Sequence, residues 1–525
     1  MVHVIRTLNT ALEGDQKRLI GLVAGDYTNT RPLALLDSPD TIVLGLEMAM
    51  SDVHGGVSCP SGEKWRILRN VSVLGLAFMV QFSAYTGITH LQSTVNSSGG
   101  LGTASLTSVY AGLIFSSVFL STSVIRWLGC KRTVIAAFIA YMPYIGAQFY
   151  PQFSTMIPTG LLMGLGGGPL WCAKCTYVTV ITKTFSEITR VDSEVVTVQF
   201  FAIFFTIYIF CHVWGNLVSS LVFSLDAGDV QDGVTCGANF CPSTASTTNN
   251  TNLARPSDEK IYTVAGIYLG CMVLAVCIVS YHEDTRDCDS KGASMVQLVT
   301  STFKMLRQPR LLMLMPLSVW IGMQEGFMGA DYTAAYVSCA WGILNIGYVM
   351  ICYGVTNALS AVITGSLVRL TGRVPIVVCA TVLHSGVVLG LLWWEPRSHD
   401  KAVFFVMSGL WGVADGVWQI QINAMYGVLF PGQEEAAFSN FKLCTSVGYI
   451  LTYSYSSYIC TDVKLYIILT LMLVGVAGYL SVEWRERNRT DARLNKELKY
   501  CISLACLWIP VGRVGRTEQN RRTFE

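Results

Sequence analysis

Charge is scarce in this chain. Only 13% of its 525 residues are Asp, Glu, Lys or Arg, about half the fraction found in a soluble domain. The 36 basic residues nearly balance the 34 acidic ones, which leaves a net charge of +2. Such a balance gives no support to nucleic-acid binding, which needs clustered basic residues. With 52% hydrophobic residues, intrinsic disorder of the whole chain is also excluded.

Motifs of common catalytic sites are missing from the sequence. It contains no nucleophile elbow, no phosphate-binding loop and no cluster of metal-ligand residues. Cys172 and Cys175 have the spacing of a redox motif, but they lie in an apolar run without histidine partners, which favours packing. We therefore expect no enzymatic activity, no cofactor and no metal site.

Long apolar runs fill most of the chain. A helix needs about 20 residues to cross a hydrocarbon core of about 30 Å, and about twelve runs meet this rule. The expected spans are residues 70–91, 106–127, 133–150, 156–182, 196–223, 261–281, 311–337, 341–367, 374–394, 403–430, 438–459 and 465–483. The predicted fold class is an all-α membrane protein with its helices in two parallel six-helix repeats, as in the major facilitator fold.

Basic residues gather in the polar breaks on one side of these spans. Arg126, Lys131 and Arg132 follow the second span, for example, whereas the opposite side has few. By the positive-inside rule, we expect both termini to be cytoplasmic. The predicted organisation is a cytoplasmic tail (1–65), a first half (66–282) with an exoplasmic loop (224–260), a cytoplasmic linker (283–310), a second half (311–483) and a second cytoplasmic tail (484–525). Nothing at the start of the sequence resembles a cleavable signal peptide.

An internal repeat relates the two halves. A shift of 353 − 110 = 243 positions pairs Tyr110 with Tyr353 and also pairs Gly129 with Gly372. A shift of 412 − 164 = 248 positions pairs the fourth span with the tenth. Two similar halves of six spans are the parallel-repeat plan of the major facilitator fold.

Small residues recur every fourth position in the fourth and tenth spans. They are Gly160, Gly164 and Gly168 in the fourth span, and Ser408, Gly412 and Gly416 in the tenth. Residues at this spacing share one helix face and allow another backbone to approach closely. The pattern predicts sites of helix packing.

Polar and ionisable residues inside the spans are the candidates for function. A carboxylate near the bilayer centre costs about 2.5–3.5 kcal/mol, so it usually faces a cavity or a partner. The candidate cavity or ion-coupling residues are Gln324, Glu325 and Asp331 in the seventh span, Asp415, Trp418, Gln419 and Asn423 in the tenth, and Lys174 in the fourth as the counter-charge. A spacing of seven predicts that Gln324 and Asp331 share a helix face. A neutral, hydrogen-bonded bundle is the alternative.

The tail and the exoplasmic loop carry candidate modification and sorting signals. Cys236 and Cys241 lie in the loop and are predicted to form a disulfide with each other. Candidate N-glycosylation sites are Asn249 in the same loop and Asn96, which lies close to the first span. In the N-terminal tail, Asp15, Leu19 and Ile20 have the form of an endolysosomal sorting signal, with an unstructured solvated tail as the alternative.

Several stretches resemble the uncoordinated (UNC-93) family, nearest its A-type branch. The resemblance covers about residues 69–483 and is carried by Gln324-Glu325-Gly326-Phe327, Asp331-Tyr332-Thr333, the span-ten stretch 409–419, Tyr426-Gly427-Val428-Leu429-Phe430 and Ala436-Ala437-Phe438. It implies a major-facilitator-like protein whose relatives are accessory. One relative regulates a two-pore potassium channel, and another escorts nucleic-acid-sensing receptors from the endoplasmic reticulum to endosomes.

Two functions are therefore open. The resemblance favours an accessory protein that regulates or traffics another membrane protein such as a potassium channel, at the plasma membrane rather than in endosomes. The alternative is a secondary transporter of a small solute or ion, with Glu325, Asp331 or Asp415 coupled to protons or Na⁺. The expected partners are the lipid bilayer and a second membrane protein, and no nucleic acid.

Overall fold

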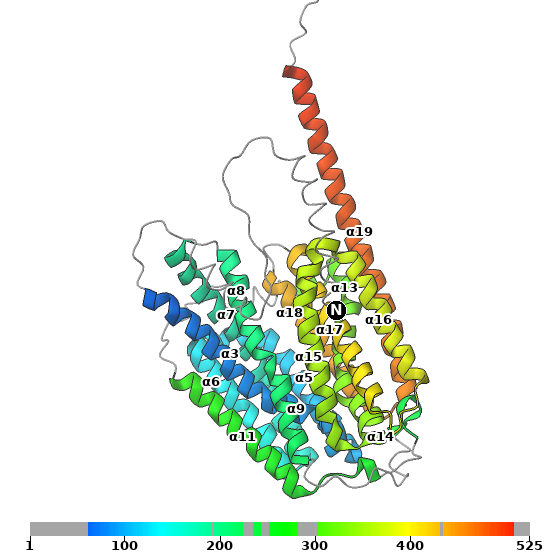
Figure 1. The fold of residues 1–525 in the computed structure, drawn as a ribbon. Helices are drawn as coiled ribbons and strands as arrows, with labels where there is room; N and C mark the ends of the chain where they lie inside the picture. Colours follow the sequence, from blue (N-terminus) through cyan, green and yellow to red (C-terminus); the bar gives the residue numbers. More distant parts are fainter. Residues whose placement is uncertain are drawn as a thin grey trace, which may run out of the picture. The chain divides into compact units, whose positions relative to one another are not determined.

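The computed structural model describes residues 61–190, 193–223, 235–242, 251–281, 300, 303–430 and 434–508, and within these ranges the regular elements are helices (Figure 1). This confirms the predicted all-α fold class. The candidate sorting residues Asp15, Leu19 and Ile20 and the sequon residue Asn249 lie outside the described ranges, as do nearly all of the predicted N-terminal tail and most of the predicted linker.

The helices of the two halves follow the order of the predicted spans. The first half contains α3 (Ser61–Thr89), α4 (Gln92–Val95), η1 (Ser98–Gly100), α5 (Leu101–Phe119), α6 (Ser121–Gly146), η2 (Ala147–Phe149), α7 (Phe153–Thr189), α8 (Ser193–Tyr208), α9 (Phe210–Phe223), η4 (Gly237–Asn239), η5 (Thr251–Leu253) and α11 (Asp258–Tyr281). The second half contains α13 (Pro309–Gly326), η6 (Phe327–Ser338), α14 (Cys339–Trp341), η7 (Ile343–Asn345), α15 (Ile346–Thr371), α16 (Arg373–Trp393), α17 (Lys401–Leu429), α18 (Glu434–Ser456) and α19 (Thr461–Trp508).

Many of these helices can cross a bilayer. Within the described ranges, nine are long and apolar enough to do so. Helices α6, α7 and α18 lie where the third, fourth and eleventh spans were expected, although they are not among the nine. The chain is a multi-pass membrane protein.

Equivalent glycines mark the same turn in each half. Gly129 interrupts α6 with φ 76° and ψ 169°, and Gly372 separates α15 from α16 with φ 78° and ψ 178°. Positive φ at this value costs little only for glycine, which lacks a Cβ. The two glycines are 372 − 129 = 243 residues apart, the shift of the internal repeat. The repeat is therefore present in the backbone geometry as well as in the sequence.

The glycine stripes bring helices of the same half into close contact. A Cβ added to Gly164 on α7 would lie 2.0 Å from the carbonyl oxygen of Val109 on α5, and one added to Gly416 on α17 would lie 2.4 Å from that of Asn357 on α15. Gly160, Gly168 and Gly412 have similarly close neighbours on α5 or α15. Ser408 packs and also donates a hydrogen bond to the carbonyl of Val349 at 2.7 Å. The two stripes therefore mediate packing inside the chain, as their spacing requires.

The two halves meet through one pair of equivalent contacts. Helix α5 of the first half packs on α18 of the second, and α9 of the first packs on α15 of the second. Tyr110 on α5 stacks on Tyr449 on α18 with 4.1 Å between ring centroids, and Thr103 and Ser457 share a hydrogen bond of 2.9 Å. The interface therefore has the approximate two-fold arrangement that two parallel repeats produce.

Two disulfides fasten the loop of the first half to the second half. Cys236 is bonded to Cys339, and Cys241 is bonded to Cys460. The predicted Cys236–Cys241 disulfide is therefore wrong. Spacing in the sequence favoured a local bridge, but this loop reaches across to the second half, where Thr461 donates a hydrogen bond to the carbonyl of Phe240 at 3.0 Å.

We predict that widening a packed glycine destabilises the fold, whereas widening an open one does not. Gly164→Leu should lower the melting temperature strongly, since overpacking costs about 1–3 kcal/mol even where side chains rather than backbone must move. Gly386→Leu on α16 is the matched control, because a Cβ there meets no atom within 4 Å. The measurement is thermal unfolding of the detergent-purified protein, and equal melting temperatures for the two variants would contradict the packing role.

Candidate functional site

Three carboxylates lie in the helices of the second half, and two of them, Glu325 and Asp415, are close enough to interact. Glu325 is near the end of α13, Asp331 is in η6, and Asp415 is in the middle of α17. Asp331 and Asp415 are buried, whereas Glu325 is half-buried. Their surroundings decide whether they can serve as a site or only hold helices together.

Asp415 is surrounded by uncharged donors. Its Oδ1 accepts a hydrogen bond of 2.5 Å from Gln324 Nε2 on α13, and its Oδ2 accepts from Tyr353 Oη at 2.7 Å and Asn357 Nδ2 at 2.5 Å on α15. Gln324 is held in turn by Trp411, whose Nε1 donates to Gln324 Oε1 at 2.6 Å. Asp415 therefore ties three helices together through hydrogen bonds, which is the neutral-bundle alternative that the sequence left open.

Asp331 has a buried lysine as its partner. Lys464 Nζ lies 2.7 Å from Asp331 Oδ1, with side-chain exposures of only 1% and 3%. Ser456 Oγ donates to the same oxygen at 2.6 Å, and Lys464 also donates to the carbonyl of Ser456 at 2.6 Å. This pair links η6 to the first turn of α19. A buried pair of this kind is strongly destabilised when one partner is removed.

Lys174 is not the counter-charge that we expected. Its ammonium lies among four aromatic rings, at 5.2 Å from Trp171, 5.2 Å from Phe201, 4.8 Å from Phe204 and 4.7 Å from Phe205. Cation–π attraction can stabilise a desolvated lysine by about 2 kcal/mol. The lysine is therefore accommodated entirely by residues of the first half, away from the acids.

Gln324 and Asp331 do not act on one helix face as predicted. The chain changes from α-helix to π-helix at Phe327, and the π-helix η6 continues to Ser338. A π-helix has more residues per turn than an α-helix, so a spacing of seven no longer brings side chains back to the same side. Gln324 consequently reaches α17, whereas Asp331 reaches α18 and α19.

Glu325 lies where the two halves meet. It accepts hydrogen bonds from Gln419 Nε2 on α17 and Tyr449 Oη on α18. Tyr449 stacks on Tyr110 of the first half, and Asn423 Nδ2 donates to the carbonyl of Gln419 at 2.6 Å. Glu325, Gln419 and Asn423 therefore form the one predicted group that stands next to the inter-half contact.

Trp418 and Asn96 lie in the interior. Trp418 is fully buried and packs edge-on against Trp320 with 5.4 Å between ring centroids. Asn96 is also buried, and its Nδ2 donates to Gln92 Oε1 and to Gln148 Oε1, both at 2.9 Å. In the folded chain this amide nitrogen is not accessible to a glycan, contrary to the sequon prediction at Asn96.

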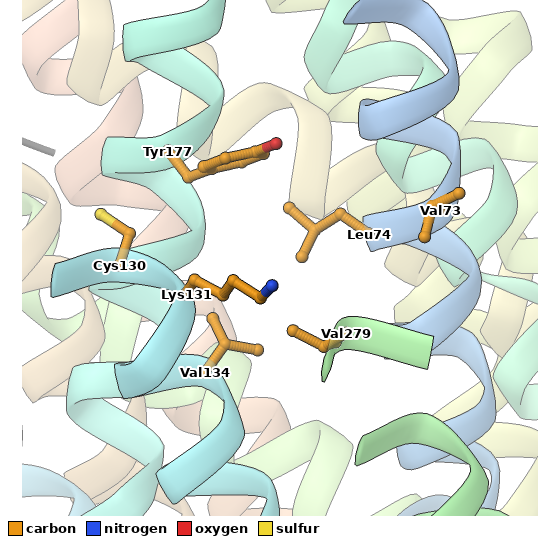
Figure 2. A pocket seen from close by; sticks show the side chains of 7 residues that line it. All are labelled: Val73, Leu74, Cys130, Lys131, Val134, Tyr177 and Val279. Carbon is orange, nitrogen blue, oxygen red and sulfur yellow. The ribbon is translucent and has the colours of Figure 1, made fainter. Parts of the chain in front are cut away.

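A small recess in the first half lies apart from the acids (Figure 2). It has a cavity volume of about 30 Å³ between α3, α6, α7 and α11, and most of its lining is apolar. Lys131 extends into the gap beside Val279, and its Nζ donates to the carbonyl of Ser280 at 3.1 Å. Lys131 is thus bound to α11, and the lining of the recess contains no Asp or Glu that could couple to an ion.

Sequence reasoning missed four residues of this network: Lys464, Tyr353, Asn357 and Tyr449. Tyr353 could have been found, because the internal repeat already paired it with Tyr110. Lys464 was placed in a polar break, although it stands beside the long apolar run of α19. The aliphatic part of a lysine at the start of a span can lie along the helix and bring its ammonium group to a buried acid. The position of Lys464 at the start of a span was therefore the signal that could have identified it.

Comparison with known proteins gives one consistent family. The family described as ion channel regulatory protein UNC-93 matches residues 93–393 and 390–480. "Protein unc-93 homolog A" of Homo sapiens is 42% identical over 429 residues, covering 80% of this chain and 93% of the relative, and that of Xenopus laevis is 41% identical over 431 residues, covering 80% and 94%. A Caenorhabditis elegans relative named "Putative potassium channel regulatory protein unc-93" is 32% identical, covering 80% of this chain and 61% of the relative.

Solved structures show the same fold at low identity. The crystal structure of nucleoside transporter NupG superposes with a TM-score of 0.55 at 12% identity, covering 78% of this chain and 98% of the transporter. A D-xylose-proton symporter superposes with a TM-score of 0.53 at 13% identity, covering 79% and 96%. At such identities the likeness concerns the fold, and it confirms the major-facilitator-like architecture.

We predict that the Asp331–Lys464 pair behaves as one unit in stability. Lys464→Met or Asp331→Asn alone should each cost about 3–5 kcal/mol, since each leaves a buried charge without its partner. The double variant should recover part of this loss, with a coupling of about 1–3 kcal/mol. Unfolding of the purified protein measures all three, and Lys304→Met at an exposed position before α13 is the matched control. Strictly additive losses would show that the pair is not coupled.

Proposed function

Since the chain belongs to the UNC-93 family of ion channel regulatory proteins, we propose that it is an accessory subunit that regulates or traffics another membrane protein. A potassium channel is the first candidate partner, because the worm relative carries that description in its name. In this role the major-facilitator-like fold serves as a scaffold, and its function depends on which partner it holds.

The observation that carries this proposal is the covalent connection between the halves. Secondary transporters of this plan expose a central site alternately by rocking one half against the other. Here the Cys236–Cys339 and Cys241–Cys460 disulfides join a loop of the first half to two segments of the second. At that end both disulfides tie the loop segment 235–242 to the second half, which favours a fixed scaffold over a rocking one.

The environment of the buried acids supports the same proposal. Asp331 is paired with Lys464, and Asp415 accepts from three uncharged donors. An acid that couples transport has to exchange its partner during the cycle, whereas both of these have partners on neighbouring helices of their own half. Their arrangement suits residues that fix the helices of the second half.

We propose that the protein is oriented with both termini in the cytoplasm. The end that carries the Cys236–Cys339 and Cys241–Cys460 disulfides is taken as the exoplasmic side, because disulfides form in oxidising compartments. Most Lys and Arg residues then face the cytoplasm, as the positive-inside rule requires. We propose the plasma membrane as the main location, with the tail residues Asp15, Leu19 and Ile20 as a route to endosomes.

A partner protein has to bind a surface other than the two glycine stripes predicted from the sequence. The stripes on α7 and α17 are occupied by α5 and α15 inside the chain, so no partner can use them. On α11, Gly266 and Gly270 are also four residues apart, but they are exposed and a Cβ there meets no atom within 4 Å. Exposed Val273 and Leu274 continue this face, which would suit a membrane-spanning helix of the channel.

We predict that Gly266→Leu with Gly270→Leu weakens association with the channel without affecting folding. The substitutions meet empty space in the isolated chain, so its melting temperature should be unchanged, while a partner helix could no longer approach closely. Co-purification with co-expressed potassium channels, together with current recording, measures the effect. Gly365→Leu on α15, another open position, is the control. Unchanged co-purification with a confirmed partner would remove this face of α11 from the interface.

Secondary transport remains the second candidate function because of Glu325. This acid is half-buried beside Gln419 and Asn423 at the contact between the halves, where transporters of this fold bind their substrates. Glu325 also interacts with Asp415, so these two acids are the ones whose positions suit ion coupling.

Flux measurements separate the two functions. We expect vesicles that contain the purified protein to show no solute or ion flux, with the disulfides intact or reduced. Flux that appears after reduction and is abolished by Glu325→Gln or Asp415→Asn, with normal protein insertion, would overturn the accessory proposal in favour of transport.

A further inference from the structure

A second recess lies at the end of the second half that is opposite the disulfides. It has a cavity volume of about 270 Å³ and lies between the first turns of α13 and the part of α19 that follows its apolar run. Its main lining residues are Arg310 and Met313 from α13 and Val482, Arg485, Glu486 and Arg489 from α19. The two helices pack against each other, and α19 continues well beyond its neighbours in Figure 1. We call this feature the arginine recess.

Positive charge dominates the arginine recess. Three guanidinium groups surround one carboxylate, since Arg310 and Arg489 each lie 3.0 Å from Glu486 and Arg485 lines the same cavity. The side chains of Arg310 and Arg489 remain 37% and 57% exposed, so a ligand can reach them. An excess of arginine over acid is a pattern that recognises phosphate groups, because the planar guanidinium can donate two hydrogen bonds to a phosphate.

The start of α13 adds to this field. Pro309 occupies the first position of this 18-residue helix, after Gln308 as its N-cap. The unpaired N–H groups of a helix start and the helix dipole both favour a nearby anion. Because Gln308 and Pro309 line the recess themselves, the helix start and the arginines act on the same space.

The recess is at the depth of lipid headgroups. Helix α19 begins at Thr461, and about 20 residues of helix cross the hydrocarbon core, so Val482 lies near its boundary. Trp484 is 65% exposed, as expected of an aromatic residue at the membrane interface. Met313 and Val482 therefore form an apolar inner wall, and the arginines lie farther out. A phospholipid has the same order of apolar and charged parts.

We propose that the arginine recess binds the phosphate-bearing headgroup of an anionic membrane lipid, with the acyl chains along Met313 and Val482. The phosphate is held by Arg310, Arg485 and Arg489, and it competes with Glu486 for two of them. Basic pockets between spans on the cytoplasmic side are known places for such lipids, and the orientation proposed above puts the recess on that side. The inference does not depend on the identity of a channel partner.

Native mass spectrometry of the full chain in detergent tests this inference. The protein is titrated with a phosphatidylinositol phosphate, with phosphatidylcholine and with the soluble inositol phosphate headgroup. We expect the anionic lipid to bind more tightly than the other two. Arg310→Gln with Arg489→Gln should weaken its binding about twentyfold, since each arginine near an anionic surface contributes roughly fivefold.

Two further variants distinguish a built site from general attraction. Arg487→Gln removes a charge from the same helix but from outside the recess, and it should leave binding nearly unchanged. Glu486→Gln removes the competing carboxylate and should strengthen binding, a gain that misfolding cannot produce. Equal losses for Arg487→Gln and for the recess variants, or equal binding of both lipids, would overturn the inference. Equal affinity for the soluble headgroup would show a site for free phosphate compounds instead of a lipid.

Discussion

A carboxylate inside a membrane-spanning helix has to be given a partner, and this demand organises the second half of the molecule. Asp415 accepts hydrogen bonds from residues on α13 and α15, and Asp331 forms an ion pair with Lys464 at the start of α19. Each solution joins helices that are distant in sequence. Because an unpaired group in hydrocarbon costs several kcal/mol, the helices that carry these acids cannot separate without losing the partners.

The internal repeat shows that equivalent positions of the two halves carry different kinds of residue. The position equivalent to Asp415 is 415 − 248 = 167, and it is occupied by glycine. A Cβ at Gly167 would already lie 2.8 Å from Leu113 Cδ1, so a carboxylate there would require the Leu113 side chain to move. Its one deeply buried lysine, Lys174, is surrounded by aromatic rings instead. The first half is therefore held together by packing, aromatic contacts and uncharged hydrogen bonds, and the second half also by buried carboxylates.

The sequence alone predicted those features that depend on local spacing. Run lengths located the helices, glycines every fourth residue located the close helix contacts, and Gly129 and Gly372 marked the equivalent turns. Partners at long range could not be predicted in the same way. The spacing of Cys236 and Cys241 says nothing of Cys339 or Cys460, and the face that Asp331 presents depends on a π-helix whose residues have ordinary helical composition. Lys174 was chosen because the fourth and tenth spans were both expected to approach the midline, but in the folded chain Lys464 is the base that pairs with Asp331.

Alternating access in the transporter fold has two requirements. The disulfides oppose the first, and the pairing of the buried acids opposes the second. Alternating access needs an interface that opens at each end in turn and a central charge that is free to change partners. In this chain one end of the interface is covalently held, and Asp331 and Asp415 are engaged within their own half. Glu325 alone stands at the contact between the halves, where Tyr449 and Tyr110 connect it to the first half. In the proposed accessory role, the fold is retained as a nearly fixed body, and a fixed body presents a constant outer surface. A constant outer surface is what an accessory subunit needs, because the free energy of binding its partner is then not spent on selecting one of several conformations.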